Sequence, residues 1–404
     1  MTKPTVFILA AGANTRMFPL NYDHHKAFLT LNGQRLVEHT IENLSQHGFE
    51  KIVVVTPNNQ DKTEIEELAA NSKVNIEIVA QKQALGMGDA ILSAKSLCQD
   101  QFFVIFPYHT HIGPVLNQML DLQASTVVCA VKTKTPENYG ILKIKDDLAF
   151  GLIEKPTRDR APSDLKIQGA YLLNNQFIKY LENTPQDEYS FEMALNQMMS
   201  ENPIKLLKLE KELPSLKYSW QLFDFQQVFF NELTSFIHPT ANVAKNAVID
   251  EKNGPVYISA NAVISHCSRI VGPAFIGEKV MVGDFSLIRQ SHLEAGVVVG
   301  ANTEVVRSIL MPQASIHYSY LADSILADEV KIGAGLITAN KRLDRKNIQV
   351  QVKDQKVDTQ TNHLGVIVGA RAALGIGVKT MPGVLVAAES KIMPSETIYQ
   401  HPSD

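Results

Sequence analysis

An uninterrupted six-residue period is the feature of this sequence that most constrains its fold. Aliphatic residues recur at every sixth position in the second half of the chain, at Ile258, Ile264, Ile270, Ile276, Val282 and Ile288. The same spacing returns near the end, at Val386, Ile392 and Ile398. A hexapeptide repeat of this kind predicts a parallel β-helix, because each rung of such a coil points one aliphatic side chain inward.

Two further features mark this half of the chain. Glycine repeatedly follows the aliphatic residue, as in Ile276-Gly277, Val282-Gly283, Ile332-Gly333, Val368-Gly369 and Ile376-Gly377. Between Asn340 and His363 the period breaks in a polar stretch, KRLDRKNIQVQVKDQKVDTQTN. This stretch predicts a loop that leaves the coil. Such a loop either lines a ligand site or is solvated and without a role.

The first part of the chain, up to about residue 233, alternates strand and helix signals instead. Short apolar runs predict strands at 5–10, 51–57, 75–80, 102–106 and 125–131. Helical spacing occupies 36–48 (ended by Gly48), 63–71, 89–97 and 114–124. This alternation is typical of a Rossmann-like α/β domain with a mostly parallel sheet covered by helices. Because 404 residues are long for one domain, we predict two, at 1–233 and 234–404.

The composition excludes several classes of protein. A net charge of −4 and a pI near 6.3 argue against a nucleic-acid binder or a polybasic membrane-surface protein. No apolar run approaches the roughly 18 residues of a transmembrane helix, and the N-terminus lacks the pattern of a signal peptide. Cys98, Cys129 and Cys267 are far apart and form no CxxC pair. We therefore expect reduced thiols, no zinc site and a cytoplasmic location.

A loop of small residues follows the first predicted strand, with the sequence AAGANTR from Ala10 to Arg16. In α/β sheets, ligands bind at the carboxyl ends of the strands. Small residues let backbone amides approach phosphates, and an arginine can neutralise negative charge. The loop is therefore a candidate ligand site.

This loop and the hexapeptide half together resemble the sugar-1-phosphate nucleotidyltransferases fused to a left-handed β-helix. The group comprises bifunctional N-acetylglucosamine-1-phosphate uridylyltransferase/glucosamine-1-phosphate acetyltransferases and archaeal-type glucose-1-phosphate thymidylyltransferase relatives. The resemblance covers nearly the whole chain. It implies an α/β nucleotidyltransferase domain followed by a left-handed parallel β-helix, with a sugar phosphate and a nucleotide as substrates. It also implies a homotrimer, with no nucleic acid or membrane as partner.

The resemblance assigns nucleotide-site residues in the α/β half. Against the family pattern AAGxGTRxxP, Asn14 stands where glycine is usual, and asparagine tolerates positive φ. Arg16 and Lys26 would be the catalytic cations. The segment from Gln81 to Ala90 resembles a base-recognition segment, with Met87 in place of threonine. The implied nucleotide-binding residues are Ala11, Gly12, Gln81 and Gly86.

Three later motifs resemble the sugar side of the site. They are Tyr139-Gly140, Glu154-Lys155-Pro156 and Gly169-Ala170-Tyr171. Through them the resemblance implies that a sugar phosphate is bound by Gly140, Glu154, Lys155 and Gly169.

The metal positions depart from the family, which holds Mg²⁺ with two aspartates because that ion prefers oxygen ligands. Tyr108 stands at the first position and Leu222 at the second, with Asp224 two residues later as the one candidate ligand. His109 and His111 could bind a softer metal or be solvated. Mg²⁺ is therefore expected only if nucleotidyl transfer is retained, and that transfer is predicted to be impaired.

The β-helix half keeps more of its family's chemistry. Residues 315–320 (SIHYSY) and 332–340 (IGAGLITAN) resemble the HxxY and IGAGTITxN blocks of the acetyltransferase. In that resemblance His317 is the base that accepts the proton of the attacking amine, with acetyl-CoA as co-substrate. A structural histidine is the alternative. The implied sugar-phosphate and donor contacts are Arg289, Arg307, Tyr320, Asn340 and Lys346. Val306 and Lys331 stand where a lysine and an asparagine are usual.

Three functions remain open from the sequence. The leading hypothesis is acetyl transfer from acetyl-CoA to an amino-sugar 1-phosphate, beside an impaired nucleotidyltransferase domain. The second is an active NDP-sugar pyrophosphorylase that uses UTP or dTTP. The third is a non-catalytic regulatory or scaffold subunit that binds a sugar nucleotide.

Overall fold

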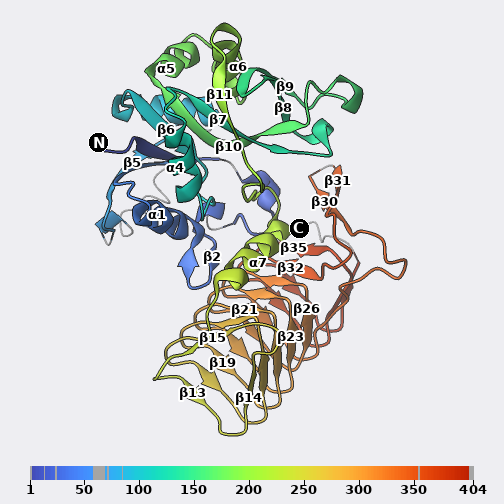
Figure 1. Cartoon of the computed structure of the whole chain (residues 1–404). Coiled ribbons are helices and arrows are strands. Elements are labelled where there is room, and N and C mark those ends of the chain that lie inside the picture. Colours follow the sequence, from blue (N-terminus) through green and yellow to red (C-terminus); the bar gives the residue numbers. More distant parts are fainter. Residues whose placement is uncertain are drawn as a thin grey trace. The chain divides into compact units, whose positions relative to one another are not determined.

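The computed structural model describes residues 2–12, 14–22, 25–57, 69–70, 72–83, 85–353 and 355–399. The chain divides into two compact units (Figure 1). One, here the α/β unit, comprises Met1–Ala13 and Leu36–Pro214. The other, here the coil unit, comprises Asn14–Arg35 and Ser215–Asp404. The loop AAGANTR is therefore shared, since Asn14 onward packs with the coil unit.

The α/β unit is built on one nine-stranded mixed sheet. Its strands run in the order β5 (Asn75–Ala80), β4 (Lys51–Thr56), β1 (Thr5–Leu9), β6 (Gln101–Ile105), β10 (Leu165–Asn174), β7 (Val127–Lys132), β11 (Ile204–Lys208), β9 (Leu148–Glu154) and β8 (Gly140–Lys145). The five strands expected from the sequence are confirmed as β1, β4, β5, β6 and β7. The first four in the spatial order are parallel. The sequence did not predict β8 to β11, and β10 runs antiparallel to both of its neighbours.

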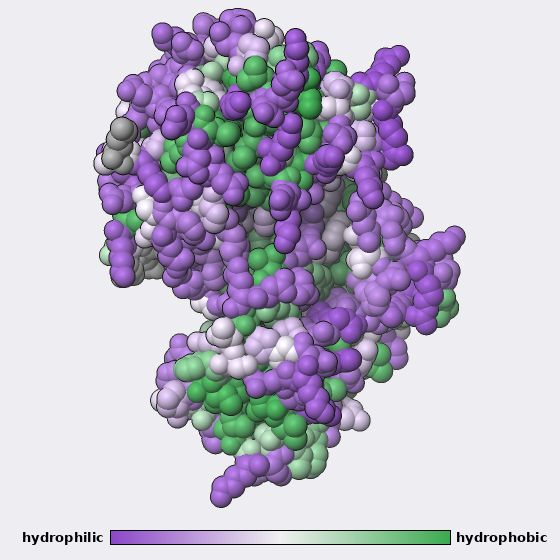
Figure 2. All heavy atoms as spheres, viewed as in Figure 1, coloured by the Kyte–Doolittle hydropathy of each residue, from purple (hydrophilic) through white to green (hydrophobic). Residues whose placement is uncertain are grey.

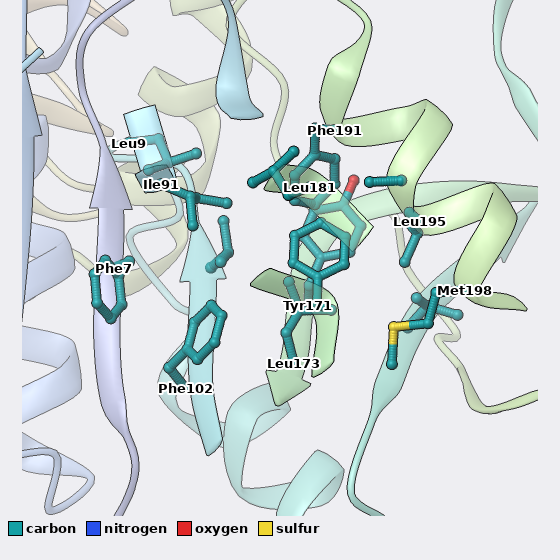
Figure 3. Packing of buried hydrophobic residues seen from close by; sticks show 14 of the residues in the cluster. Phe7, Leu9, Ile91, Phe102, Tyr171, Leu173, Leu181, Phe191, Leu195 and Met198 are labelled. Atoms are coloured by element: carbon teal, nitrogen blue, oxygen red, sulfur yellow. The ribbon is translucent and has the colours of Figure 1, made fainter. Parts of the chain in front are cut away.

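Helices cover this sheet because its parallel strands are apolar on both faces. They are α1 (Leu36–Gln46), α3 (Met87–Ser93), α4 (Gly113–Asp121), α5 (Asn175–Glu182) and α6 (Ser190–Glu201). Gly48 ends the first helix as expected, with φ of 78°. Most of the helix expected at 63–71 lies outside the described residues. Figure 3 shows the core that α3, α5 and α6 form on the sheet, in which the Phe191 ring packs edge-on against Tyr171 and Phe177.

The coil unit is a left-handed parallel β-helix of three eight-stranded sheets. The first face contains β12 (Phe236–Ile237), β15 (Val256–Ile258), β18 (Ala274–Ile276), β21 (His292–Leu293), β24 (Ile309–Leu310), β27 (Ile325–Leu326), β32 (Val366–Val368) and β35 (Val384–Val386). The second contains β13 (Asn242–Val243), β16 (Val263–Ile264), β19 (Met281–Val282), β22 (Val298–Val299), β25 (Ser315–Ile316), β28 (Lys331–Ile332), β33 (Ala373–Leu374) and β36 (Lys391–Ile392). The third contains β14 (Val248–Asp250), β17 (Arg269–Val271), β20 (Leu287–Arg289), β23 (Glu304–Val306), β26 (Tyr320–Ala322), β29 (Ile337–Thr338), β34 (Lys379–Thr380) and β37 (Thr397–Ile398).

The strand register explains where the six-residue period holds and where it slips. Ile258 pairs with Ile276, eighteen residues later, which is three hexapeptides. Ile276 pairs with Leu293, one residue earlier than the period requires, so the strict repeat ends after Ile288 although the coil continues. All four side chains are buried. The six-residue period therefore identified the fold but did not locate the inward residue of every coil.

Glycine follows the inward residue because the next coil lies directly against it. A Cβ on Gly283 would lie 2.5 Å from the amide nitrogen of Ala301, and one on Gly277 would lie 2.8 Å from the Leu293 carbonyl oxygen. The pair Ile376-Gly377 differs from the others, since Ile376 is 61% exposed. The inward residue on that coil is Leu374, which Gly375 follows, and Gly377 occupies a turn with φ of 69°.

The coil unit also includes elements from before residue 234. They are α7 (Leu222–Glu232), the hairpin of β2 (Thr30–Leu31) and β3 (Gln34–Arg35), and two short turns, Thr15–Met17 and Lys26–Phe28. The helix belongs here because its Phe230 ring stacks on His292 of β21, with ring centroids 4.4 Å apart. The polar excursion after Asn340 contains the hairpin of β30 (Gln349–Val352) and β31 (Gln355–Asp358). Within the described part of the chain, no helix is long and apolar enough to cross a membrane.

Candidate functional site

The first part of the candidate site is the loop after β1. A Cβ added to Gly12 would meet nothing within 4 Å, so the chain leaves open space at this position. Asn14 has φ of 53°, the left-handed conformation that its side chain was expected to tolerate. Arg16 is exposed on the turn Thr15–Met17, and Met17 is buried beneath it. The exposed guanidinium of Arg16 suits an anionic ligand.

Lys26 is the second expected cation, and its environment is strongly positive. Its Nζ donates a hydrogen bond to the carbonyl oxygen of Leu216, 2.7 Å away. Burial, together with the charges of Arg16 and Lys217, lowers the pKa of Lys26 to about 8. Three cations therefore lie close enough to repel one another, which a bound phosphate would relieve. Lys217 belongs to none of the motifs, so sequence reasoning missed it.

His25 fixes the turn that presents Lys26. Its Nδ1 accepts a hydrogen bond from the amide of Ala27, 3.1 Å away. Burial, together with the Lys26 charge, lowers the pKa of His25 to about 3, so the imidazole is neutral at physiological pH. His25 therefore adds no positive charge beside Lys26.

In the α/β unit, Gln81 organises the segment before α3. Its Nε2 donates to the Gly86 carbonyl oxygen (3.1 Å) and to Oδ2 of Asp89 (2.7 Å). Gly86 has φ of 91°, and a Cβ there would lie 2.8 Å from the Glu188 carbonyl oxygen, so only glycine fits. The structure thus brings together Gln81 and Gly86, which were both predicted to bind the nucleotide.

The sugar-side motifs meet on the hairpin of β8 and β9. Gly140 pairs with Glu154 across the two strands, and the Lys155 amide donates to the Tyr139 carbonyl oxygen at 3.0 Å. A Cβ on Gly140 would lie 2.8 Å from Oε2 of Glu154, so this glycine makes room for the carboxylate. Both Glu154 and Lys155 are exposed. These four residues form one cluster.

Lys166 of β10 also lies at this cluster and was not expected from the sequence. Its Nζ lies 3.7 Å from the centroid of the Tyr139 ring and forms an ion pair with Glu212. Only 3% of the Lys166 side chain is exposed. Gly169, also on β10, lies against the Phe106 ring, which a Cβ would overlap. The role of Gly169 visible here is thus to admit that ring.

The position of the first metal-binding aspartate is occupied by an aromatic cluster. Tyr108 is buried and stacks on Phe106, with ring centroids 5.5 Å apart and planes 11° apart. His109 is buried edge-on to both rings, and Nδ1 of His111 lies 2.8 Å from the Thr110 hydroxyl. Among the described residues, no three His, Cys, Asp or Glu side chains could hold a metal ion. The aromatic cluster therefore places no carboxylate at the first predicted metal position.

The second metal position, on α7, is equally apolar. Leu222 is fully buried at the start of this helix. Asp224 is exposed in the first helical turn, where a negative charge complements the helix dipole. Its location gives this carboxylate a structural role in the helix, and among the described residues it belongs to no group of three or more His, Cys, Asp or Glu side chains that could hold a metal ion.

On the coil unit, His317 lies at the corner between the second and third faces. Its imidazole is exposed, and its carbonyl oxygen accepts a hydrogen bond from the Ser319 hydroxyl at 2.7 Å. On the preceding coil Gly300 lies below it, and a Cβ there would come within 2.9 Å of His317 Nδ1. The fold thus presents this imidazole to solvent above a glycine.

A polar network lies at the other edge of the third face. Nε and Nη2 of Arg307 donate to Oδ1 and Oδ2 of Asp323, at 2.6 and 2.7 Å. Nδ2 of Asn340 also donates to Oδ2 of Asp323. The carboxylate raises the pKa of Arg307 further. Arg307 and Asn340 were predicted to bind the sugar phosphate, but the Asp323 that joins them was not.

The remaining predicted contacts are more dispersed. Arg289 ends β20, where it pairs with Val306 of β23, and its buried Nε has no hydrogen-bond partner in the described part of the chain. Val306 is fully buried, so the stacking neighbour of Arg289 is apolar. Tyr320 begins β26, on the His317 side of the face. Lys346 is exposed in the excursion, where its amide donates to Asp344.

Comparison with known proteins agrees with both units. Residues 5–212 match the model of the Nucleotidyl transferase family. A bifunctional sugar-1-phosphate nucleotidylyltransferase/acetyltransferase of Sulfurisphaera tokodaii is 30% identical over 97% of this chain and 96% of its own length. A bifunctional protein GlmU of Methanococcus maripaludis is 31% identical over 95% of this chain and 92% of its own. Apo UDP-glucose pyrophosphorylase aligns with a TM-score of 0.49 at 20% identity, covering 57% of this chain and 99% of that structure.

The fold and these matches define an α/β nucleotidyltransferase domain joined to a parallel β-helix. The chain belongs to the Nucleotidyl transferase family and, over nearly its full length, to the group of bifunctional sugar-1-phosphate nucleotidyltransferase/acetyltransferases.

Proposed function

We propose that this protein transfers the acetyl group of acetyl-CoA to the amino group of an amino-sugar 1-phosphate, with His317 as the general base. One contrast carries the proposal. The β-helix presents an exposed imidazole at its predicted catalytic position, whereas Tyr108 at the predicted metal position is buried among aromatic rings. The names of the bifunctional relatives support the same substrate class.

The proposed reaction needs little from the protein beyond a base and an anion site. As the amine attacks the thioester carbonyl, the His317 imidazole takes its proton, and the thiolate of coenzyme A leaves and is protonated. Arg289 and the network of Arg307, Asp323 and Asn340 lie at the opposite edge of the third face. A three-residue strand such as β26 spans roughly 7 Å between its end residues, so an amino-sugar phosphate lying across it could reach both edges.

The test is thiol release from acetyl-CoA in the presence of glucosamine 1-phosphate. We expect His317→Ala to lower the rate by about 100-fold or more, since positioned bases contribute that much. His266→Ala is the matched control, because His266 is an exposed histidine at the same kind of corner on an earlier coil. No thiol release by the unaltered protein with any amino-sugar 1-phosphate would contradict the proposal.

We propose, in addition, that the chain binds a nucleotide without Mg²⁺-dependent transfer. The positive cluster of Arg16, Lys26 and Lys217 supports the binding, and the aromatic cluster at Tyr108 argues against the transfer. Nucleotide-dependent thermal stabilisation without pyrophosphate release is the expected result. Pyrophosphate release from UTP or dTTP with a sugar 1-phosphate and Mg²⁺ would instead establish an active pyrophosphorylase. Nucleotide binding without acetyl transfer would favour a regulatory subunit.

We also propose that the protein is a cytoplasmic homotrimer. On the visible face of the coil unit, apolar side chains gather around β13, β15 and β19 (Figure 2). Exposed apolar residues of these coils include Val248, Met281 and Phe285. Patches of this kind mark interaction surfaces more often than free surface. Light scattering should give three times the chain mass of 44.7 kDa.

A further inference from the structure

The segment from Asn14 to Arg35 carries Arg16 and Lys26, and it is held on the β-helix by a buried carboxylate. Glu294 is fully buried at the corner after β21. Its Oε1 accepts the amide of Asn32 at 2.7 Å, and its Oε2 accepts the amide of Gly33 at 2.9 Å. The two oxygens of this carboxylate therefore each accept a hydrogen bond from the turn of the β2–β3 hairpin.

The backbone conformation of the hairpin turn allows both of these hydrogen bonds. Asn32 and Gly33 have φ of 60° and 81°, which is the left-handed pair of a tight two-residue hairpin turn. A Cβ on Gly33 would lie 3.3 Å from Cζ of Phe275, so the turn lies close against the first face of the coil. The sequence Asn-Gly thus allows two consecutive amides to point at one acceptor.

Glu294 is the one carboxylate at this position among the described coils of the first face. None of the residues at the equivalent position on the other coils of the first face is acidic: His238, Ser259, Gly277, Met311, Ala327, Gly369 and Ala387. Burying a carboxylate there is unfavourable unless hydrogen-bond donors compensate. The two amides of the hairpin turn are the donors that the structure provides.

Other contacts hold the same segment. The Tyr22 hydroxyl donates to Oε2 of Glu389 at 3.1 Å, and the Arg371 guanidinium lies 5.4 Å from the Tyr22 ring centroid. The Ser219 hydroxyl donates to the Phe18 carbonyl oxygen at 3.1 Å. Glu294 differs from these contacts because it is fully buried and uses both oxygens.

We propose that Glu294 is a positioning residue for nucleotide binding: its carboxylate fixes the Asn32-Gly33 turn on the coil, and thereby sets where Arg16 and Lys26 meet the phosphates. This role rests on the proposed nucleotide site. Its ligand class is a nucleoside triphosphate.

The hydrogen bonds from Asn32 and Gly33 are strongest when the Glu294 carboxylate is ionised. Burial, with a smaller contribution from the charge of Asp328, raises the pKa of Glu294 to about 7 against the opposing effect of the two amides. The test is therefore made at pH 8.5 on the full chain, using Glu294→Gln and Glu294→Ala. Glu278→Gln is the matched control, because Glu278 lies at the same corner on the preceding coil, half exposed and paired with Lys279.

Hydrogen–deuterium exchange and UTP affinity give separate readouts. We expect Glu294→Ala to speed exchange in peptides covering residues 14–35, and Glu294→Gln to weaken UTP binding about tenfold. The difference in UTP affinity between Glu294→Gln and the unaltered protein should vanish below about pH 6, where Glu294 is protonated. Glu278→Gln should change neither. Unchanged exchange in Glu294→Ala would overturn the anchor, whereas absence of UTP binding by the unaltered protein would overturn the nucleotide site itself.

Discussion

Arg307 and Asp323 form a bidentate ion pair between two successive coils, with the carboxylate side chain 8% exposed and the guanidinium 36% exposed. The pair joins the ends of β23 and β26, and Asn340 joins it from the coil that follows. A predicted sugar-phosphate residue is thus also part of the scaffold that holds three coils in register.

Replacing Asp323 should destabilise the coil unit. Asp323→Ala removes an acceptor from both Arg307 and Asn340, and we expect a loss of about 1–2 kcal/mol in the free energy of unfolding by urea. Asp344→Ala is the control, because Arg342 and Asp344 form the same bidentate geometry in solvent. The control should show no measurable change. Equal losses in both variants would contradict the assigned role of burial.

The glycines of the coil and of the loop should respond differently to alanine. Gly283→Ala places a Cβ against the backbone of the next coil, and overpacking of this kind costs about 1–3 kcal/mol. Gly12→Ala places its Cβ in open space, so the protein should remain as stable, whereas UTP affinity should fall. Thermal unfolding and calorimetric titration measure the two effects. A destabilised Gly12→Ala would show that this glycine is structural.

Nucleotide affinity should depend on the charge of Lys26. Its pKa is lowered to about 8, so the ammonium loses its proton as the pH rises through 8, and the dissociation constant for UTP should increase between pH 7 and pH 9. Lys26→Arg keeps its charge throughout and should remove this part of the pH dependence. The same change in the UTP dissociation constant between pH 7 and pH 9 for Lys26→Arg and the unaltered protein would contradict the prediction.

His292 should make the coil unit sensitive to acid. It is fully buried between the Phe230 and Phe275 rings, and neither ring nitrogen has a hydrogen-bond partner among the described residues. Burial lowers its pKa to about 3. The folded state therefore binds fewer protons than the unfolded state, so stability is present above about pH 6.5 and is lost progressively as the pH falls towards 3.

His292→Phe tests this directly. A phenyl ring keeps the stack and removes two unsatisfied polar atoms, so we expect about 1 kcal/mol more stability at pH 7. The gain should grow as the pH falls to 5. Glu294 contributes in the opposite sense, because its raised pKa makes stability fall between about pH 4.5 and pH 7. Comparing urea midpoints of the variant and the unaltered protein at each pH isolates the His292 effect.

Some local geometry of the candidate site could be predicted because it depends on residues close together in sequence. Asn14 takes the positive φ expected of it, and Gly140, Glu154 and Lys155 meet on one hairpin. Lys217, Lys166, Asp323 and Glu294 were missed because each acts through residues distant in the chain. Only the asparagine-glycine pair at 32–33 signalled a tight hairpin, and nothing local indicated what its amides would contact.

The sequence by itself determined the two architectures, since a six-residue period and an alternation of strand and helix follow from local packing geometry. It also determined that Tyr108 and Leu222 replace expected carboxylates. The tertiary structure alone decided that Asn14–Arg35 and α7 pack with the coil rather than with the α/β sheet. That choice depends on burial: His292 and Glu294 find their partners, an aromatic ring and two backbone amides, only when segments more than fifty residues away fold over the first face.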